Sequence, residues 1–122
     1  MLNDTILEHF RNPHNAGNLD DATAVVEVTN PVCGDTMRLS VGIDGGRIRE
    51  ARFKTQGCVA SIAAGSVLTE LLIGKSLNEA RAITTATISD SLGGLPPTTM
   101  HAAELALDAV AALLEQMSRE PA

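Results

Sequence analysis

The hydrophobic period of this chain changes once, and that change constrains the fold more than any other feature of the sequence. Between residues 24 and 54 apolar and polar residues alternate in three short runs, as in half-buried strands. Asp44, Gly45 and Gly46 form a hairpin signal between the second and third runs. From Val59 onward the apolar residues recur at helical spacing. The pattern therefore predicts strands at 24–29, 37–43 and 48–54, followed by helices.

Consecutive short strands joined by short turns form an antiparallel sheet with one solvated face. A helix, three strands and then more helices place the chain in the α+β class, with helices packed on one face of a three-stranded antiparallel sheet. The 122 residues suffice for one domain, 1–122, whose core needs no disulfide. Two cysteines are also too few for a disulfide framework.

Capping and turn residues set the expected bounds of the first two helices. Asn3 or Asp4 can cap a first helix, which must end before Pro13 because proline disfavours helical geometry in the residue before it. The helix that starts at Val59 should end near Gly74, since glycine commonly follows the last helical residue.

Three further signals follow along the chain. Residues 76–79 (Ser-Leu-Asn-Glu) have the form of a capping box, and residues 87–90 predict a brief helical turn that ends at the glycines 93–94. The prolines 96–97 precede the last long helix, whose end at 118–122 is expected to fray. That helix carries an apolar stripe for packing, formed by Ala106, Val110, Leu113 and Met117.

Composition excludes several functional classes. A net charge of −6 provides no basic face for nonspecific nucleic-acid binding, and two phenylalanines are the only aromatic residues among Phe, Trp and Tyr. No run approaches the roughly 18 apolar residues that a membrane span needs. The first five residues lack the basic start of a secretory leader. We therefore expect a cytoplasmic protein with reduced thiols and no nucleic-acid or membrane partner.

Four residues with metal-binding side chains stand at loops and helix starts. Cys33 lies between a Pro-Val pair and a glycine, and Asp35 follows two residues later. Cys58 follows Gly57 at the predicted start of a helix, where the helix dipole favours the metal-binding thiolate. His101 lies near the first turn of the last helix and offers a neutral imidazole. Together these side chains suggest one metal site.

Each of these residues also has a simpler interpretation. A free cysteine often serves as a small buried hydrophobe, an aspartate in a loop as a turn residue, and a single histidine as a surface residue. Isolated cysteines are a weaker metal signal than paired Cys-x-x-Cys motifs. His9, on the first helix, and His14, in the following turn, are expected at the surface.

Longer motifs around these positions resemble those of a known family. They are Asn-Pro-Val-Cys-Gly-Asp-Thr-Met at 30–37, Phe-Lys-Thr-Gln-Gly-Cys-Val-Ala-Ser at 53–61, and Leu-Pro-Pro at 95–97 leading to His101. A further match runs from residue 6 to residue 17. In order and separation these motifs resemble the iron–sulfur cluster assembly scaffold family, the IscU type and the N-terminal domain of NifU.

The resemblance implies a small α+β domain that is not an enzyme. Such a scaffold assembles a labile two-iron two-sulfur cluster and transfers it to acceptor apo-proteins, and a cysteine desulfurase donates the sulfur as persulfide. The family's ligands match Cys33, Asp35, Cys58 and His101, and zinc can occupy the same kind of site. Cys33 and Cys58 are then the candidate persulfide acceptors.

The chain departs from the family at two places. Family members carry a third cysteine directly after the histidine, where this chain has Ala102. The chaperone-docking segment Leu-Pro-Pro-Val-Lys ends here in Thr98 and Thr99, which makes chaperone docking doubtful. Three hypotheses follow: a scaffold or carrier for a cluster, a remnant or regulatory domain that binds one zinc or iron ion, and a protein that shuttles persulfide between Cys33 and Cys58.

Overall fold

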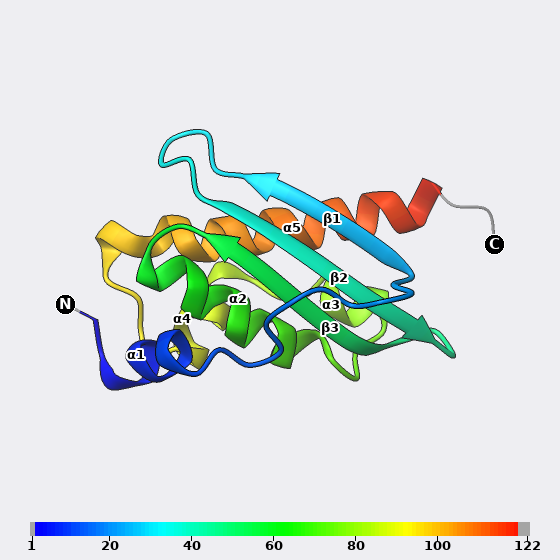
Figure 1. Ribbon diagram of the computed structural model, residues 1–122, viewed down its shortest axis with the longest axis horizontal. Coiled ribbons are helices and arrows are strands. Elements are labelled where there is room, and N and C mark those ends of the chain that lie inside the picture. Colours follow the sequence, from blue (N-terminus) through cyan, green and yellow to red (C-terminus); the bar gives the residue numbers. More distant parts are fainter. Residues whose placement is uncertain (1, 120–122) are drawn as a thin grey trace.

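The three predicted strands form one antiparallel sheet. In the computed structural model, which describes residues 2–119, β1 (Ala24–Thr29), β2 (Thr36–Asp44) and β3 (Arg47–Gln56) pair in the order β1-β2-β3 (Figure 1). Strands β2 and β3 extend one or two residues beyond the predicted bounds. The hairpin between them turns at Gly45 and Gly46, whose φ values of +62° and +78° suit glycine in a tight turn.

One face of the sheet is solvated, as predicted. Glu27, Arg38 and Lys54 lie side by side across the three strands and are exposed. The other face is apolar and belongs to the core. Its main side chains are Val26 from β1, Met37, Leu39 and Val41 from β2, and Ile48, Ala51 and Phe53 from β3.

The helices cover the apolar face (Figure 1). Helix α1 (Asp4–Arg11) packs on α2 (Val59–Leu72), which lies on β3, and α5 (Met100–Arg119) lies along β1. Three short elements connect α2 to α5: α3 (Leu77–Ala80), α4 (Thr85–Ser91) and the 3-10 turn η1 (Pro97–Thr99). The predicted fold class is therefore confirmed. No helix within residues 2–119 is both long and apolar enough to cross a membrane.

A glycine allows α2 to approach the sheet closely. A Cβ atom on Gly65 would lie 2.4 Å from the Phe53 ring, too near for any larger residue. Alanines continue this close packing between α2 and α5, since six alanines of these helices are fully buried. They are Ala63 and Ala64 on α2, and Ala102, Ala103, Ala106 and Ala109 on α5. Small side chains thus hold α2 firmly against β3, and α2 carries the residues discussed below.

Most of the predicted helix boundaries match the structure. The side chain of Asn3 caps α1, and both hydrogen bonds of the capping box join Ser76 and Glu79. The predicted start of the α4 turn at residue 87 is wrong, because α4 begins at Thr85 behind an N-cap at Thr84. Thr87 is the third residue of that helix and bonds back to Thr84. The expected fraying at 118–122 falls largely outside the described residues, and α5 continues to Arg119.

The segment after α1 pairs with the outer edge of β3. Phe53 donates its backbone N–H to the Asn15 carbonyl at 3.0 Å, and the N–H of Gly17 donates to the Phe53 carbonyl at 2.8 Å. Ala16 forms the corresponding parallel bridge. Asn15 adopts a φ of +59°, which asparagine tolerates better than most residues. This short pairing anchors the connection between α1 and the sheet.

The prediction that His9 lies at the surface is wrong. His9 follows Ile6 by three residues, so both lie on the face of α1 that packs against α2, and both are buried. Its Nδ1 lies 2.7 Å from the Oγ of Ser66, a hydrogen bond that makes burial of the ring tolerable. His14 is exposed, as predicted.

Candidate metal centre

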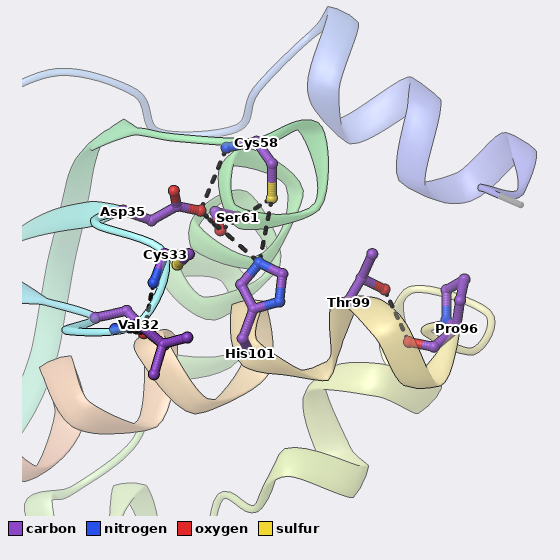
Figure 2. Close-up of polar contacts among 9 residues, drawn as sticks. Val32, Cys33, Asp35, Cys58, Ser61, Pro96, Thr99 and His101 are labelled. Carbon is purple, nitrogen blue, oxygen red and sulfur yellow. Dashed lines mark hydrogen bonds and ion pairs between the residues drawn. The ribbon is translucent and has the colours of Figure 1, made fainter.

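Three separate segments bring the predicted ligands to one end of the molecule. They are the β1–β2 loop, the start of α2 and the start of α5, which meet at the same end of the sheet (Figure 1). The donor atoms of Cys33, Asp35 and His101 all lie within 4.8 Å of one another. The Sγ of Cys58 lies 3.6 Å from the Nε2 of His101 (Figure 2). Residues up to 68 positions apart in the sequence thus form one cluster.

The β1–β2 loop holds Cys33 at the surface. The two ends of the loop are joined by a backbone hydrogen bond, in which the Asn30 N–H donates to the Asp35 carbonyl at 2.8 Å. The Asn30 side chain is buried and accepts hydrogen bonds from the N–H groups of Val32 and Cys33. Gly34, with a φ of +78°, completes the turn. The loop is therefore locally ordered by its own backbone, while the thiol of Cys33 stays exposed.

Cys58 is the N-cap residue of α2. It has extended backbone geometry and its thiol is free and exposed. Ser61, one turn into the helix, places its Oγ 3.4 Å from the Cys58 Sγ. The first helical N–H groups are orphan donors with a partial positive charge, which favours an anionic ligand or thiolate at this end.

Asp35 lies at the centre of the cluster and is buried. Its Oδ2 accepts hydrogen bonds from the Ser61 hydroxyl at 2.7 Å and from the Cys58 N–H at 3.3 Å, and lies 3.9 Å from the His101 Nε2 (Figure 2). Burial raises the pKa of the Asp35 carboxyl, but hydrogen bonds from Ser61, from the Cys58 backbone and from both thiols outweigh it and lower the pKa below its usual value. Asp35 is therefore held as a carboxylate.

Gly57 makes room for this carboxylate. A Cβ atom at residue 57 would lie 2.5 Å from the Asp35 Cγ and 2.6 Å from its Oδ2. No real side chain tolerates such contacts, so the glycine is required by a close approach and not by an unusual backbone angle. The Gly-Cys pair at 57–58 thus places the thiol and accommodates the aspartate at once.

His101 is the second residue of α5 and points toward Cys58 and Asp35 (Figure 2). The preceding turn is fixed by the Thr99 hydroxyl, which donates to the Pro96 carbonyl at 2.9 Å. Ala102 comes next and is fully buried. Its side chain is a methyl group, which has no donor atom for a metal. The side chains that can bind a metal here are those of the four predicted residues.

Sequence reasoning missed the role of Ser61. It is fully buried, and its hydroxyl connects Asp35 to the start of α2. The signal was its position three residues after the cysteine, the spacing at which a first-turn side chain faces the cap residue. Only the structure shows that its partner is Asp35, from a loop 26 residues away.

Two thiols, a carboxylate and an imidazole form a donor set of mixed softness. Thiolates suit iron–sulfur clusters and zinc, imidazole suits zinc and iron, and carboxylate is the hardest donor of the three. Asp35 and Ser61 occupy buried positions, whereas both thiols are accessible from outside. The arrangement can therefore take up a metal or cluster from solvent or from a partner protein.

Comparison with known proteins agrees with this geometry. The family model described as the NifU-like N terminal domain matches residues 1–121. The chain is 44% identical over 110 residues to the iron-sulfur cluster assembly scaffold protein IscU 1 of Archaeoglobus fulgidus, covering 90% of this chain and 72% of that protein. It is 42% identical over 122 residues to the scaffold protein IscU of Escherichia coli, covering 96% of this chain and 94% of that protein. These relatives are named scaffolds, in agreement with the prediction of a protein that is not an enzyme.

A solved structure supports the fold. The N-terminal part of a nitrogen-fixing NifU-like protein from Brucella abortus superposes with a TM-score of 0.76 at 22% identity, covering 98% of this chain and 95% of that one. The family model spans almost the whole chain, and the two relatives exceed 40% identity. The chain belongs to the IscU and NifU N-terminal family of iron–sulfur cluster assembly scaffolds, and its two cysteines are Cys33 and Cys58.

Proposed function

We propose that this chain holds a labile two-iron two-sulfur cluster at Cys33, Asp35, Cys58 and His101 and passes it to acceptor apo-proteins. The observation that carries the proposal is the convergence of these four side chains, with three donor atoms within 4.8 Å and the fourth residue 3.6 Å from one of them. A cytoplasmic location suits this role, because thiols stay reduced there.

The number and kind of donors fit such a cargo. A two-iron two-sulfur cluster takes four protein ligands, normally four cysteines, and histidines replace two of them in some proteins. Here two thiols would be completed by Asp35 and His101. Carboxylate and imidazole bind iron less tightly than thiolate does, so mixed ligation favours release of the cluster. This lability is what a protein that transfers its cargo requires.

Sulfur delivery falls to Cys33 and Cys58 in this proposal. Both thiols are free and exposed, so a cysteine desulfurase can reach either of them. Cys33 lies beside Val32, which is 94% exposed and gives the loop an apolar tip for contact with a partner. Ala102 has no sulfur and is buried, so it takes no part in persulfide acceptance.

Chaperone-assisted transfer is doubtful for this chain. In segment 95–99 the apolar Leu95 is 9% exposed, and the hydroxyl of Thr99 is engaged with the Pro96 carbonyl. No lysine follows the proline pair. Direct transfer to acceptors through the exposed thiol loop is the simpler route.

A single zinc ion is the second candidate. Cys33, Asp35 and His101, with Cys58 beside His101, would supply the four ligands of tetrahedral zinc in a mixed N, O and S set. In that case the domain would be regulatory or a remnant without cluster assembly. No feature of the described residues favours the third hypothesis, a persulfide shuttle, over these two.

Anaerobic reconstitution separates the two candidates. The purified protein is incubated with ferrous iron and sulfide, and visible absorption, iron and acid-labile sulfide are measured. Charge-transfer bands together with equimolar iron and acid-labile sulfide support the proposal. A protein that takes up no sulfide and retains one zinc per site contradicts it and supports the zinc domain.

Two variants locate the site in that assay. His101→Ala should shorten the lifetime of the cluster, whereas His14→Ala, a control that changes another partly accessible histidine, should not. Ala102→Cys should prolong the lifetime because it adds a third thiol in the residue next to His101. If the lifetime with Ala102→Cys is unchanged, the alanine is not what sets the stability of the bound cluster.

A further inference from the structure

A second group of metal-binding side chains lies between α1 and α2. His14 places its Nδ1 3.0 Å from the Oε2 of Glu70, and the Nε2 of His9 lies 3.7 Å from the Oε1 of the same carboxylate. One donor atom from each residue lies within 4.8 Å of the others. The two imidazole rings are 4.8 Å apart between centroids. Three donors from two helices and a turn thus face one point.

Buried hydroxyls of α2 hold this group in place. Ser66 is fully buried, lies 2.7 Å from the His9 Nδ1 and accepts the backbone N–H of His14 at 2.8 Å. Thr69, also fully buried, donates its hydroxyl to the Ser66 carbonyl at 2.7 Å, and its Oγ1 lies 3.3 Å from the His14 carbonyl. Asn15 donates its side-chain amide to the Thr69 Oγ1 at 3.1 Å. The backbone N–H of His14 is therefore fixed by Ser66, and its ring lies beside Glu70.

The Ser66 contact engages the Nδ1 of His9 and leaves the Nε2 facing Glu70. When Nδ1 carries the proton and donates it to the Ser66 Oγ, the Nε2 keeps its lone pair on the side of Glu70. A hydrogen bond from the second ring nitrogen is the usual support of a metal-binding histidine, because it fixes both tautomer and ring orientation. The buried serine is thus placed where a supporting residue of a metal site belongs.

We propose that His9, His14 and Glu70 form a second metal site, for a divalent ion of the zinc class. Ligand atoms around tetrahedral zinc, with bonds of about 2.0–2.1 Å, lie about 3.4 Å apart. The two imidazoles lie 3.0 and 3.7 Å from the two oxygens of Glu70, and one donor atom from each of the three residues lies within 4.8 Å of the others, so small side-chain movements suffice to reach that separation. Two imidazoles and one carboxylate are the ligands of three-coordinate protein sites that leave a fourth position for water.

This site is separate from the thiol cluster. Glu70 is twelve residues after Cys58 along α2, which is about 18 Å at 1.5 Å per residue. No single ion and no two-iron cluster spans that distance, so the two sites share no ligand. They also differ in chemistry, because the second site contains no sulfur. The proposal therefore stands whether or not the thiol cluster binds iron.

The test begins with a protein in which the first site is disabled. The double variant Cys33→Ser and Cys58→Ser removes two exposed thiols and leaves His9, His14 and Glu70 unchanged. Zinc is titrated into this full-length variant by calorimetry, and cobalt is added as a spectroscopic probe. We expect one bound zinc and cobalt d–d bands without the charge-transfer absorption that thiolate ligands produce. Absence of zinc binding would overturn the proposal.

Matched single changes in the same background locate the binding. His14→Ala and Glu70→Gln alter exposed side chains and should each weaken zinc binding by at least about tenfold. His101→Ala and Glu104→Gln, the same changes elsewhere, should leave the affinity unchanged. Binding that falls with His101→Ala, or that survives both His14→Ala and Glu70→Gln, would contradict the assignment. Nitrogen-15 shifts of the His9 and His14 rings on zinc addition provide an independent readout.

Discussion

The two donor groups lie at opposite ends of α2 and are built on similar supports. At the first turn the hydroxyl of Ser61 lies 2.7 Å from the carboxylate of Asp35, and farther along the hydroxyl of Ser66 lies 2.7 Å from the ring of His9. Both serines are fully buried. In each case a serine on the helix orients a ligand that comes from another segment. One rigid helix thus positions two separate sets of donors.

What differs is the partner chemistry around each serine. The first-turn group adds two exposed thiols, Cys33 from the β1–β2 loop and Cys58 from the N-cap of α2, whereas the second group adds the His14 imidazole and the Glu70 carboxylate of α2. Soft sulfur donors select clusters and thiophilic metals, and nitrogen and oxygen donors select ions of the zinc class. The comparison teaches that one helix can support two sites whose metal preferences differ because their donor atoms differ.

The largest expected effect separates the two groups completely. Cys33→Ser with Cys58→Ser should abolish cluster binding, a loss of at least about 100-fold, because hydroxyls are poor ligands for soft metals. Zinc binding at His9, His14 and Glu70 should persist in the same protein. Iron and sulfide analysis after reconstitution, with a parallel zinc titration, measures both. If the double variant still binds a stoichiometric amount of cluster, the thiols are not the cluster ligands, and the proposed difference between the two donor groups is wrong.

The second prediction concerns space at the thiol end. Gly57→Ala places a Cβ against three atoms of the Asp35 side chain, so the carboxylate must leave the Ser61 hydroxyl and the Cys58 N–H. We expect a loss of about 3 kcal/mol in the free energy of unfolding, the upper end for overpacking, together with poor cluster retention. Urea denaturation measures the first and visible absorption the second.

A control for this change lies in β2. A Cβ on Gly42 would meet the Leu19 side chain at an ordinary 3.5 Å, and its φ is not positive. Gly42→Ala should therefore leave both stability and cluster retention close to those of the unmodified protein. Equal losses from Gly42→Ala and Gly57→Ala would show that glycine itself matters, and not the space beside Asp35.

The third prediction compares the two serines directly. Ser61→Ala removes a hydrogen bond to a buried carboxylate and should cost about 1.5–3 kcal/mol of unfolding free energy. Ser66→Ala removes two neutral hydrogen bonds, with the His9 ring and the His14 N–H, and should cost about 0.5–1.5 kcal/mol for each. The pKa of Asp35 should rise in Ser61→Ala and stay unchanged in Ser66→Ala. Denaturation curves and carbon-13 titration of the carboxyl measure these effects. A larger loss of unfolding free energy per hydrogen bond for Ser66→Ala than for Ser61→Ala would contradict this prediction.

The smallest effect is a pH dependence specific to the second group. Burial lowers the pKa of His9 below 6.5, Glu70 partly offsets this, and His14 lowers it further. Below about pH 6.5 the unfolded chain binds a proton at His9 more readily than the folded protein does. The contribution of neutral, buried His9 to stability is therefore complete above about pH 6.5 and is lost as the pH falls through the folded pKa of His9. His9→Gln should flatten the decline, measured by urea denaturation between pH 7.5 and 5. If the free energy of unfolding falls as steeply with pH in His9→Gln, the pH dependence comes from groups other than His9.

Local sequence signals sufficed for most of the fold. Alternation in three short runs predicted the strands, and Gly45 with Gly46 predicted the hairpin, because both depend only on neighbouring residues. The α4 start was missed because Thr84 and Thr87 can each serve as a cap, and only the reciprocal bonds between them show which one does. Ambiguity among neighbouring polar residues explains this error.

The sites were less predictable because their partners are distant in sequence. The four thiol-end residues were identified from their side-chain chemistry and loop positions and then from family motifs, whereas Ser61 and the close approach at Gly57 involve Asp35 from another loop. His9 was assigned to the surface because histidine is usually exposed. Its burial follows from the packing of α1 on α2 and from Ser66, 57 residues away. Contacts of this range carry no local signal.

The pairing of residues 15–17 with β3 has a consequence for self-association. An uncovered strand edge is a template on which another chain can add a strand, and proteins protect such edges with short pieces of chain. Here the protection around Phe53 depends on Asn15 and Gly17, in a segment fastened to α2 through His14. Loss of the His14 contacts with α2 would expose the edge of β3, which could then pair with another chain and aggregate. The same His14 that belongs to the second donor group therefore also helps to keep the protein soluble.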